Sequence, residues 1–165
     1  MNEELQKKAA EAEERARQYF REGLNCSECV LKSFMDVNDV NLPPEVITLA
    51  SGFGGGIGQT KNTCGAVTGA VMAISAVKGR RDPFALPEMK DRVKELQNVY
   101  QPVKALINHV EGEFGTIICR ELNKPYLEEF AGKARKKNCQ QMIGHCAALA
   151  VQYAEWQPEE KKEEE

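Results

Sequence analysis

The distribution of apolar and charged residues singles out the stretch from Val46 to Val77, in which Lys61 is the one charged residue. Its second half, from Cys64 to about Val77, is apolar on every side when placed on a helix. A helix without a polar face is buried, and a segment this short does not reach the roughly 20 residues that a bilayer span needs. The pattern therefore predicts a buried central helix over about 64–77 in a soluble domain.

Amphipathic helical periods fill most of the remaining chain. Residues 2–22 consist largely of good helix formers and carry an alanine-rich apolar stripe. This stripe predicts a surface helix packed on the core, and dimerisation through it is the alternative. Shorter helices are expected after Asn25, after Pro43 and after Thr116, and a last helix is expected from about Asn138 to Trp156.

Residues 87–111 are predicted to form one long helix, with a kink at Pro102. Its apolar positions are Met89, Val93, Leu96, Val99, Tyr100, Val103, Leu106, Ile107 and Val110. No run in the chain shows the alternation of a strand. We therefore expect an all-α fold, a single-domain bundle of about six helices over residues 1–157, followed by a disordered charged tail over 158–165.

A glycine cluster from Gly52 to Gly58 leads towards the central helix. It lacks the Gly-x-Gly-x-x-Gly spacing after a strand and the Gly-Lys-Ser/Thr of a P-loop, so nucleotide binding is not supported. Glycines instead permit positive φ angles and close backbone approach. We expect the glycines beside the central helix to let another helix or a bound cofactor approach; they are Gly54, Gly55, Gly56 and Gly65.

Charge and targeting signals narrow the class of protein. The net charge of −3 offers no basic excess for nucleic acid and no basic amphipathic face for a membrane surface. The N-terminus shows no signal peptide, so we expect a cytoplasmic protein, where thiols stay reduced. Its six cysteines are then more typical of ligands, redox groups or buried fillers than of structural disulfides.

Four cysteines fall in the first turn of a predicted helix: Cys26, Cys64, Cys119 and Cys139, with Asn25, Thr63, Thr116 and Asn138 as caps. The positive end of a helix stabilises an anion, which predicts a lowered thiol pKa at these positions. If the four helix starts converge, four thiolates meet in one place. Cysteines that only fill the core are the alternative.

The remaining candidate side chains support no other chemistry. Cys29 and Cys146 lie one turn and two turns after a cysteine of the first set, so both could still line the site. His145 precedes Cys146 but points about 100° away on a helix, and His109 is expected to be structural, with a ligand role as the lesser alternative. No Ser/His/Asp set or carboxylate pair supports a hydrolase, so enzymatic activity is left open.

The ordered pattern of Asn25-Cys26, the glycine cluster, Thr63-Cys64-Gly65-Ala66-Val67-Thr68-Gly69, Phe114-Gly115 with Cys119, and Cys139 resembles a known family. This family of redox-active helical proteins is named for the cysteine pattern C-GCAxxG-C-C and is similar to part of the split-Soret cytochromes c. The resemblance covers roughly residues 19–150. Here the glycine follows the cysteine, as Cys64-Gly65-Ala66, which is a variant of the family motif.

The resemblance implies redox activity in association with an oxidoreductase or transporter system, and it places the family's four cysteines on Cys26, Cys64, Cys119 and Cys139. Three hypotheses follow. The first is an iron–sulfur cluster held by these thiolates for electron transfer to a redox partner protein. The second is a cluster-free thiol–disulfide protein that cycles a pair such as Cys26 and Cys64. The third is a structural zinc site or a helical interaction module with buried cysteines.

Overall fold

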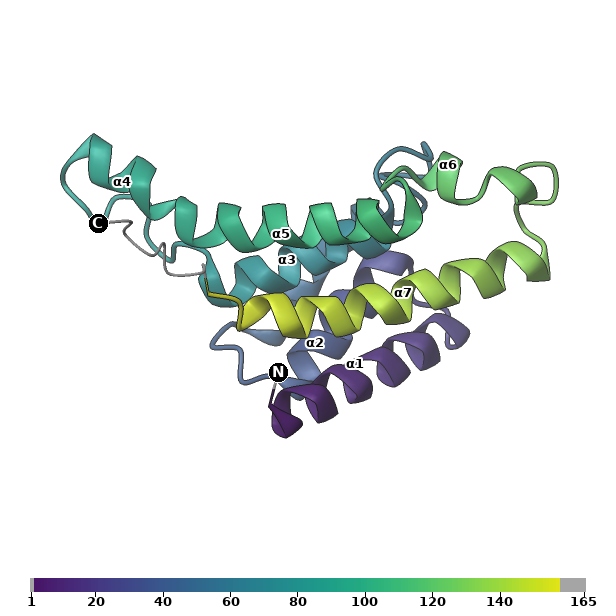
Figure 1. Cartoon of the computed structure of the whole chain (residues 1–165), viewed down its shortest axis with the longest axis horizontal. Helices are drawn as coiled ribbons and strands as arrows, with labels where there is room; N and C mark the ends of the chain where they lie inside the picture. The colour runs from purple at the N-terminus through teal and green to yellow at the C-terminus, as the bar shows by residue number, and fades with distance from the viewer. Residues whose placement is uncertain (1, 158–165) are drawn as a thin grey trace, which may run out of the picture.

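The computed structural model describes residues 2–157, so the predicted tail over 158–165 lies outside the described residues. This part of the chain contains seven α-helices, two 3₁₀ helices and no strand, which confirms the all-α prediction (Figure 1). The elements are α1 (Glu3–Arg21), α2 (Cys26–Val37), η1 (Pro44–Phe53), α3 (Gly65–Lys78), α4 (Met89–Glu95), α5 (Gln97–Phe114), α6 (Cys119–Leu122), η2 (Lys124–Tyr126) and α7 (Lys133–Ala154).

The predicted central helix is confirmed as α3, which packs against α2, α5, α7 and η1. Seven of its 14 residues are buried, among them Val67 and Ile74. Gly69 lies against α2 so closely that an added Cβ would be 2.8 Å from the carbonyl oxygen of Ser27. The absence of a side chain at this position therefore sets the distance between the two helices.

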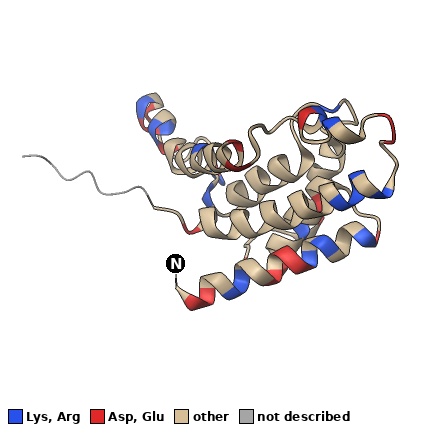
Figure 2. Ribbon diagram, turned by 45° about the vertical axis from the view of Figure 1, so that its right-hand side comes forward, with Lys and Arg blue, Asp and Glu red and all other residues tan. Residues whose placement is uncertain are grey.

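The alanine stripe of α1 faces the core of the same chain. Ala9, Ala12 and Ala16 are buried, and α1 runs along α7 (Figure 1). Charged residues recur along α1 and in the first part of α7 (Figure 2), whereas the central helix α3 has Lys78 as its one charged residue. The stripe is thus used for packing within the chain, as the amphipathic pattern predicts.

The prediction of a single helix over 87–111 is wrong in two respects: the segment forms two helices, and the first of them does not pack on the core. The chain forms α4 and α5 with a break at Leu96, and α4 projects beyond the bundle (Figure 1). Because nothing in the described chain covers this projection, Met89 and Val93 are 73% and 58% exposed. The core side of α5 begins at Val99 and continues through Leu106 and Val110.

The last helix begins at Lys133, after Gly132, and not near Asn138. The basic residues 133–137, which precede the predicted start, therefore belong to this helix, and Cys139 lies in its second turn. Within residues 2–157, no helix combines the length and the apolar character needed to cross a membrane.

Two glycine substitutions test the close contact between α2 and α3. We expect Gly69→Ala to lower the free energy of unfolding by about 1–3 kcal/mol, because overpacking against the Ser27 backbone outweighs the gain in helix propensity. Gly112→Ala in α5 is the matched control, since an added Cβ there meets no atom within 4 Å. It should be neutral or stabilising by up to about 1 kcal/mol. Urea unfolding measures the free energy of unfolding of both variants. Equal effects of the two substitutions would contradict the close contact between α2 and α3.

Candidate functional site

A small internal cavity of about 20 Å³ is lined by Cys26, Cys64, Cys119 and Cys139. These residues come from the first residue of α2, the position before α3, the first residue of α6 and the second turn of α7. The other lining residues are Gly56, Gly65, Leu122, Asn123, Asn138, Met142 and Ile143. The structure thus brings together the four cysteines that the sequence analysis selected.

Cys26 is held at the start of α2 by a capping box formed by the predicted cap, Asn25, and Glu28. The Asn25 side chain accepts a hydrogen bond from the Glu28 N–H at 3.0 Å, and the Glu28 carboxylate accepts one from the Asn25 N–H at 3.0 Å. Ser51 donates to the same carboxylate at 2.7 Å. This network connects the start of α2 to the end of η1 and so fixes the position of Cys26, the first residue of α2.

Cys64 and Cys119 are positioned by main-chain pairing and not by the predicted caps. The Cys64 N–H donates to the Ile117 carbonyl at 2.8 Å, and the Cys119 N–H donates to the Asn62 carbonyl at 2.7 Å. Thr63, which was predicted as a cap, is instead a β-bridge partner of Ile118. The N-cap position of α3 is occupied by Cys64 itself. Ile118 is the N-cap of α6, which corrects the expectation for Thr116.

The glycine cluster forms a left-handed turn over the cavity. Residues 55–59 all have φ between 59° and 75°, including Ile57 and Gln59. Left-handed backbone is unfavourable for residues with a side chain, and most of all for β-branched ones. At Gly56 an added Cβ would lie 2.8 Å from the Cys119 Cβ, so the turn brings bare backbone against this cysteine.

The four glycines singled out by sequence divide between two places. Gly56 and Gly65 line the cavity, and a Cβ on Gly65 would lie 2.9 Å from the Cys26 Cβ. Gly54 and Gly55 instead line an open surface hollow of about 670 Å³, of which Cys26 also forms part. Cys26 therefore lies between the internal cavity and the surface.

Asn123 is a site residue that the sequence analysis missed. It is only 2% exposed, and its side-chain nitrogen donates to the Cys119 carbonyl at 3.0 Å and lies 3.8 Å from the Cys119 sulfur. The Cys139 thiol donates to its oxygen at 3.5 Å. The signal in the sequence that could have identified Asn123 is its position one helical turn after Cys119. Asn138, expected as a cap, donates to Asn123 at 3.2 Å.

Burial raises the pKa values of the Cys26, Cys64 and Cys119 thiols, contrary to the lowering that was predicted from helix ends. Desolvation, followed by the charge of Cys139, raises the pKa of Cys26 to about 11, although a hydrogen bond from the Gly55 backbone opposes the change. Burial also raises the pKa of Cys64 well above its ordinary value, against hydrogen bonds from the Ala66 and Val67 backbone. The pKa of Cys119 is raised by burial and then by Cys139. The helix-end effect is present, but desolvation of a thiolate is larger.

Cys29 and Cys146 do not line the cavity. Both are fully buried; the Cys29 thiol donates to the Leu24 carbonyl at 3.6 Å, and the Cys146 thiol lies 3.7 Å from the Met142 sulfur. Burial raises the pKa of both thiols, that of Cys146 to about 12. Their surroundings are those of core residues.

Raised thiol pKa values make the metal-free, reduced protein sensitive to alkali. The unfolded chain releases thiol protons from about pH 8.5, whereas the folded protein retains them to higher pH, so stability falls as pH rises. We expect the free energy of unfolding to drop between about pH 8.5 and about pH 10.5, by at most about 1.4 kcal/mol per pH unit for each affected thiol.

Urea unfolding at a series of pH values measures this drop. Cys29→Ala removes one of the buried thiols and should make the dependence on pH shallower, in addition to a constant loss from the cavity that it creates. A free energy of unfolding that stays flat or rises over this range would contradict the assigned environment of the thiols.

The fold and the cavity define a helical protein with a buried four-cysteine site. Residues 24–153 match the family model described as "Putative redox-active protein (C_GCAxxG_C_C)". The chain belongs to this family, which confirms the resemblance seen in its sequence. A protein of Archaeoglobus fulgidus described as "Uncharacterized protein" is 25% identical over 150 residues, covering 87% of this chain and 93% of that protein. No solved structure matches the chain.

Proposed function

We propose that this redox-family protein binds an iron–sulfur cluster through Cys26, Cys64, Cys119 and Cys139 and transfers electrons to a partner protein. The observation that supports this most is the convergence of four thiols, from four elements distant in sequence, on one internal cavity. Apart from the four cysteines, the lining contains no ionisable side chain. Four thiolates are the usual ligand set of the common clusters.

The raised pKa values favour a metal over free thiols. Several buried thiolates repel one another and lose hydration, and the charge of Cys139 accordingly raises the pKa values of Cys26 and Cys119. A bound cation removes this penalty, because a coordinating thiol is deprotonated outright. When bound, the cluster would supply one-electron redox chemistry.

The chain's own residues would orient the ligands and tune the site. Asn123 hydrogen-bonds to the backbone of Cys119 and to the thiol of Cys139, and the Gly55 backbone approaches Cys26. Such contacts to sulfur set ligand orientation and reduction potential. Leu122, Met142 and Ile143 complete an apolar wall that keeps water away from the thiols.

The open hollow at Cys26 is the natural docking place for a redox partner protein, such as an oxidoreductase. The Lys61 ammonium and the Arg135 guanidinium lie 4.9 Å and 4.5 Å from the centre of the Phe130 ring, and all three residues line the hollow. A partner with an acidic patch would be attracted here and brought close to Cys26.

A single metal ion is the second candidate occupant, and the size of the cavity favours it. A volume of about 20 Å³ is close to that of one water-sized sphere, so a cluster requires the four cysteines to move outwards. Zinc fits four thiolates but carries no redox chemistry. Membership of a redox-active family therefore favours iron.

Iron and sulfide analysis after anaerobic purification tests the proposal. We expect bound iron, acid-labile sulfide and visible absorption, and we expect Cys64→Ser or Cys119→Ser to lose most of the iron because one ligand of four is removed. Cys29→Ser is the control, since this buried cysteine lies outside the cavity, and it should retain iron.

Two outcomes would decide against a cluster, and a third would remove the support that the cysteine variants give to ligation. Protein without iron or visible absorption contradicts the proposal. Iron without sulfide, or zinc, indicates the single-ion site. Equal iron loss in Cys64→Ser and Cys29→Ser would mean that the substitutions act through folding and not through ligation; circular dichroism of each variant detects such unfolding.

Thiol trapping separates the cluster from the thiol–disulfide alternative. Thiols with a raised pKa are poor nucleophiles in exchange, so we expect alkylation after mild oxidation of the metal-free protein to label as many cysteines as before. Paired loss of two labels, for instance on Cys26 and Cys64, would instead support a reversible disulfide. Mass spectrometry of the labelled peptides gives the result for each cysteine.

A further inference from the structure

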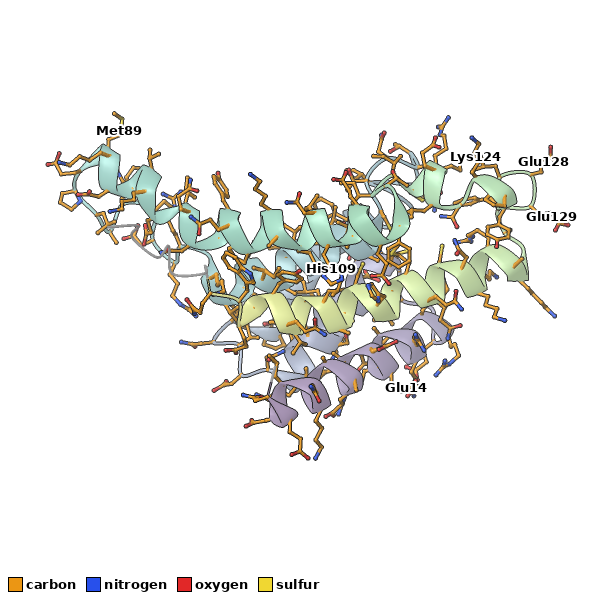
Figure 3. All side chains as sticks on the ribbon, in the orientation of Figure 1. Glu14, Met89, His109, Lys124, Glu128 and Glu129 are labelled. Carbon is orange, nitrogen blue, oxygen red and sulfur yellow. The ribbon has the colours of Figure 1, made fainter. Side chains whose placement is uncertain are left out.

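The two histidines of the chain meet Glu113 at the contact between α5 and α7. His109 lies on α5, on the side of this helix that faces α7 (Figure 3). Glu113 follows one turn later on α5, and His145 comes from α7. One ligand atom from each residue lies within 4.8 Å of the other two. The Glu113 carboxylate is 2.8 Å from His145 Nε2 and 3.5 Å from His109 Nε2. Both imidazoles therefore present the same nitrogen to one carboxylate.

Neighbouring groups hold each imidazole in this orientation. The Tyr153 hydroxyl is 2.8 Å from His109 Nδ1, the nitrogen on the far side of the ring from Glu113. The Phe114 ring packs edge-to-face on His145, with centroids 5.2 Å apart. A hydrogen bond to the second ring nitrogen is the usual support of a metal-binding histidine, because it selects the tautomer and fixes the ring.

Within residues 2–157, His145 Nε2 has no hydrogen-bond partner. Its nitrogen is buried and makes no hydrogen bond of acceptable geometry, although it lies close to the Glu113 carboxylate. A buried polar atom left without a partner lowers stability. A neutral imidazole nitrogen in this condition is free to bind a cation.

We propose that His109, Glu113 and His145 form a binding site for a divalent transition-metal ion of the zinc class, separate from the cysteine cavity. Two imidazole nitrogens and one carboxylate oxygen are a donor set that zinc accepts, with a fourth position left for water or another ligand. Tetrahedral zinc brings its ligand atoms to about 3.4 Å from one another. The observed spread of up to 4.8 Å closes to this value by small rotations of exposed or half-buried side chains.

The alternative is an ion pair between Glu113 and protonated histidines, without a metal. The two cases differ in the protonation of the rings, since an ion pair needs charged imidazoles and a metal needs neutral ones. They also differ in the response to Glu113→Gln, because an amide removes the charge and weakens metal binding but leaves neutral imidazoles in place.

Zinc titration followed by NMR of the histidine rings tests the site in the full-length, reduced, metal-free protein. Because the chain has two histidines and both belong to this cluster, zinc bound by the cysteines does not enter the signal directly. Near neutral pH we expect both imidazoles to shift together along one binding curve. Glu113→Gln should weaken the apparent Kd by at least about tenfold, since a ligand is lost.

Glu111→Gln is the matched control, because it makes the same change at an exposed position of α5 outside the cluster. It should leave the apparent Kd unchanged, and Tyr153→Phe should weaken binding while both rings still shift. The site is refuted if the imidazole signals stay in place at a large excess of zinc, if only one histidine responds, or if Glu113→Gln and Glu111→Gln behave alike. None of these outcomes depends on what the cysteines bind.

Discussion

Two main-chain hydrogen bonds, from Cys64 to the Ile117 carbonyl and from Cys119 to the Asn62 carbonyl, hold together the parts of the chain on which the cysteine cavity depends. They join the loop before α3 to the loop before α6, so the two helices begin side by side. Their cysteines consequently face a common space, which α2 and α7 close with Cys26 and Cys139. Without this pairing, α6 has too few residues to hold Cys119 in place by itself.

The site combines several features that oppose folding. The left-handed turn over residues 55–59 includes two residues with side chains, and the buried thiols retain their protons because burial makes thiolates unfavourable. Such strain persists only where the surrounding structure determines it fully. Here the close contacts of α1 with α7 and of α2 with α3 provide that support, and the strained backbone lies directly against Cys119.

Helix α7 carries two kinds of donor side chain, a thiol and an imidazole, on different sides. Cys139 and His145 are separated by roughly 240° around its axis, as helix geometry requires. Thiols therefore gather in the internal cavity, where the proposed cluster would be held, and imidazoles gather at the contact with α5, where the proposed zinc-class ion would bind. If both proposed sites are occupied, the separation of the two donor sets would allow each to select its own ion.

The sequence by itself determined the helical class, the buried α3 and the choice of four cysteines, because these depend on apolar period, on local capping as at Asn25, and on an ordered motif. It could not place Asn123, since a buried polar residue is recognisable only from its partners. It also did not place the start of α7, which follows Gly132 and not Asn138. It also assigned the thiols a lowered pKa from helix ends alone. Only the tertiary structure decided that burial outweighs the helix dipole, and that His109, Glu113 and His145 meet, because both depend on residues brought together from distant segments.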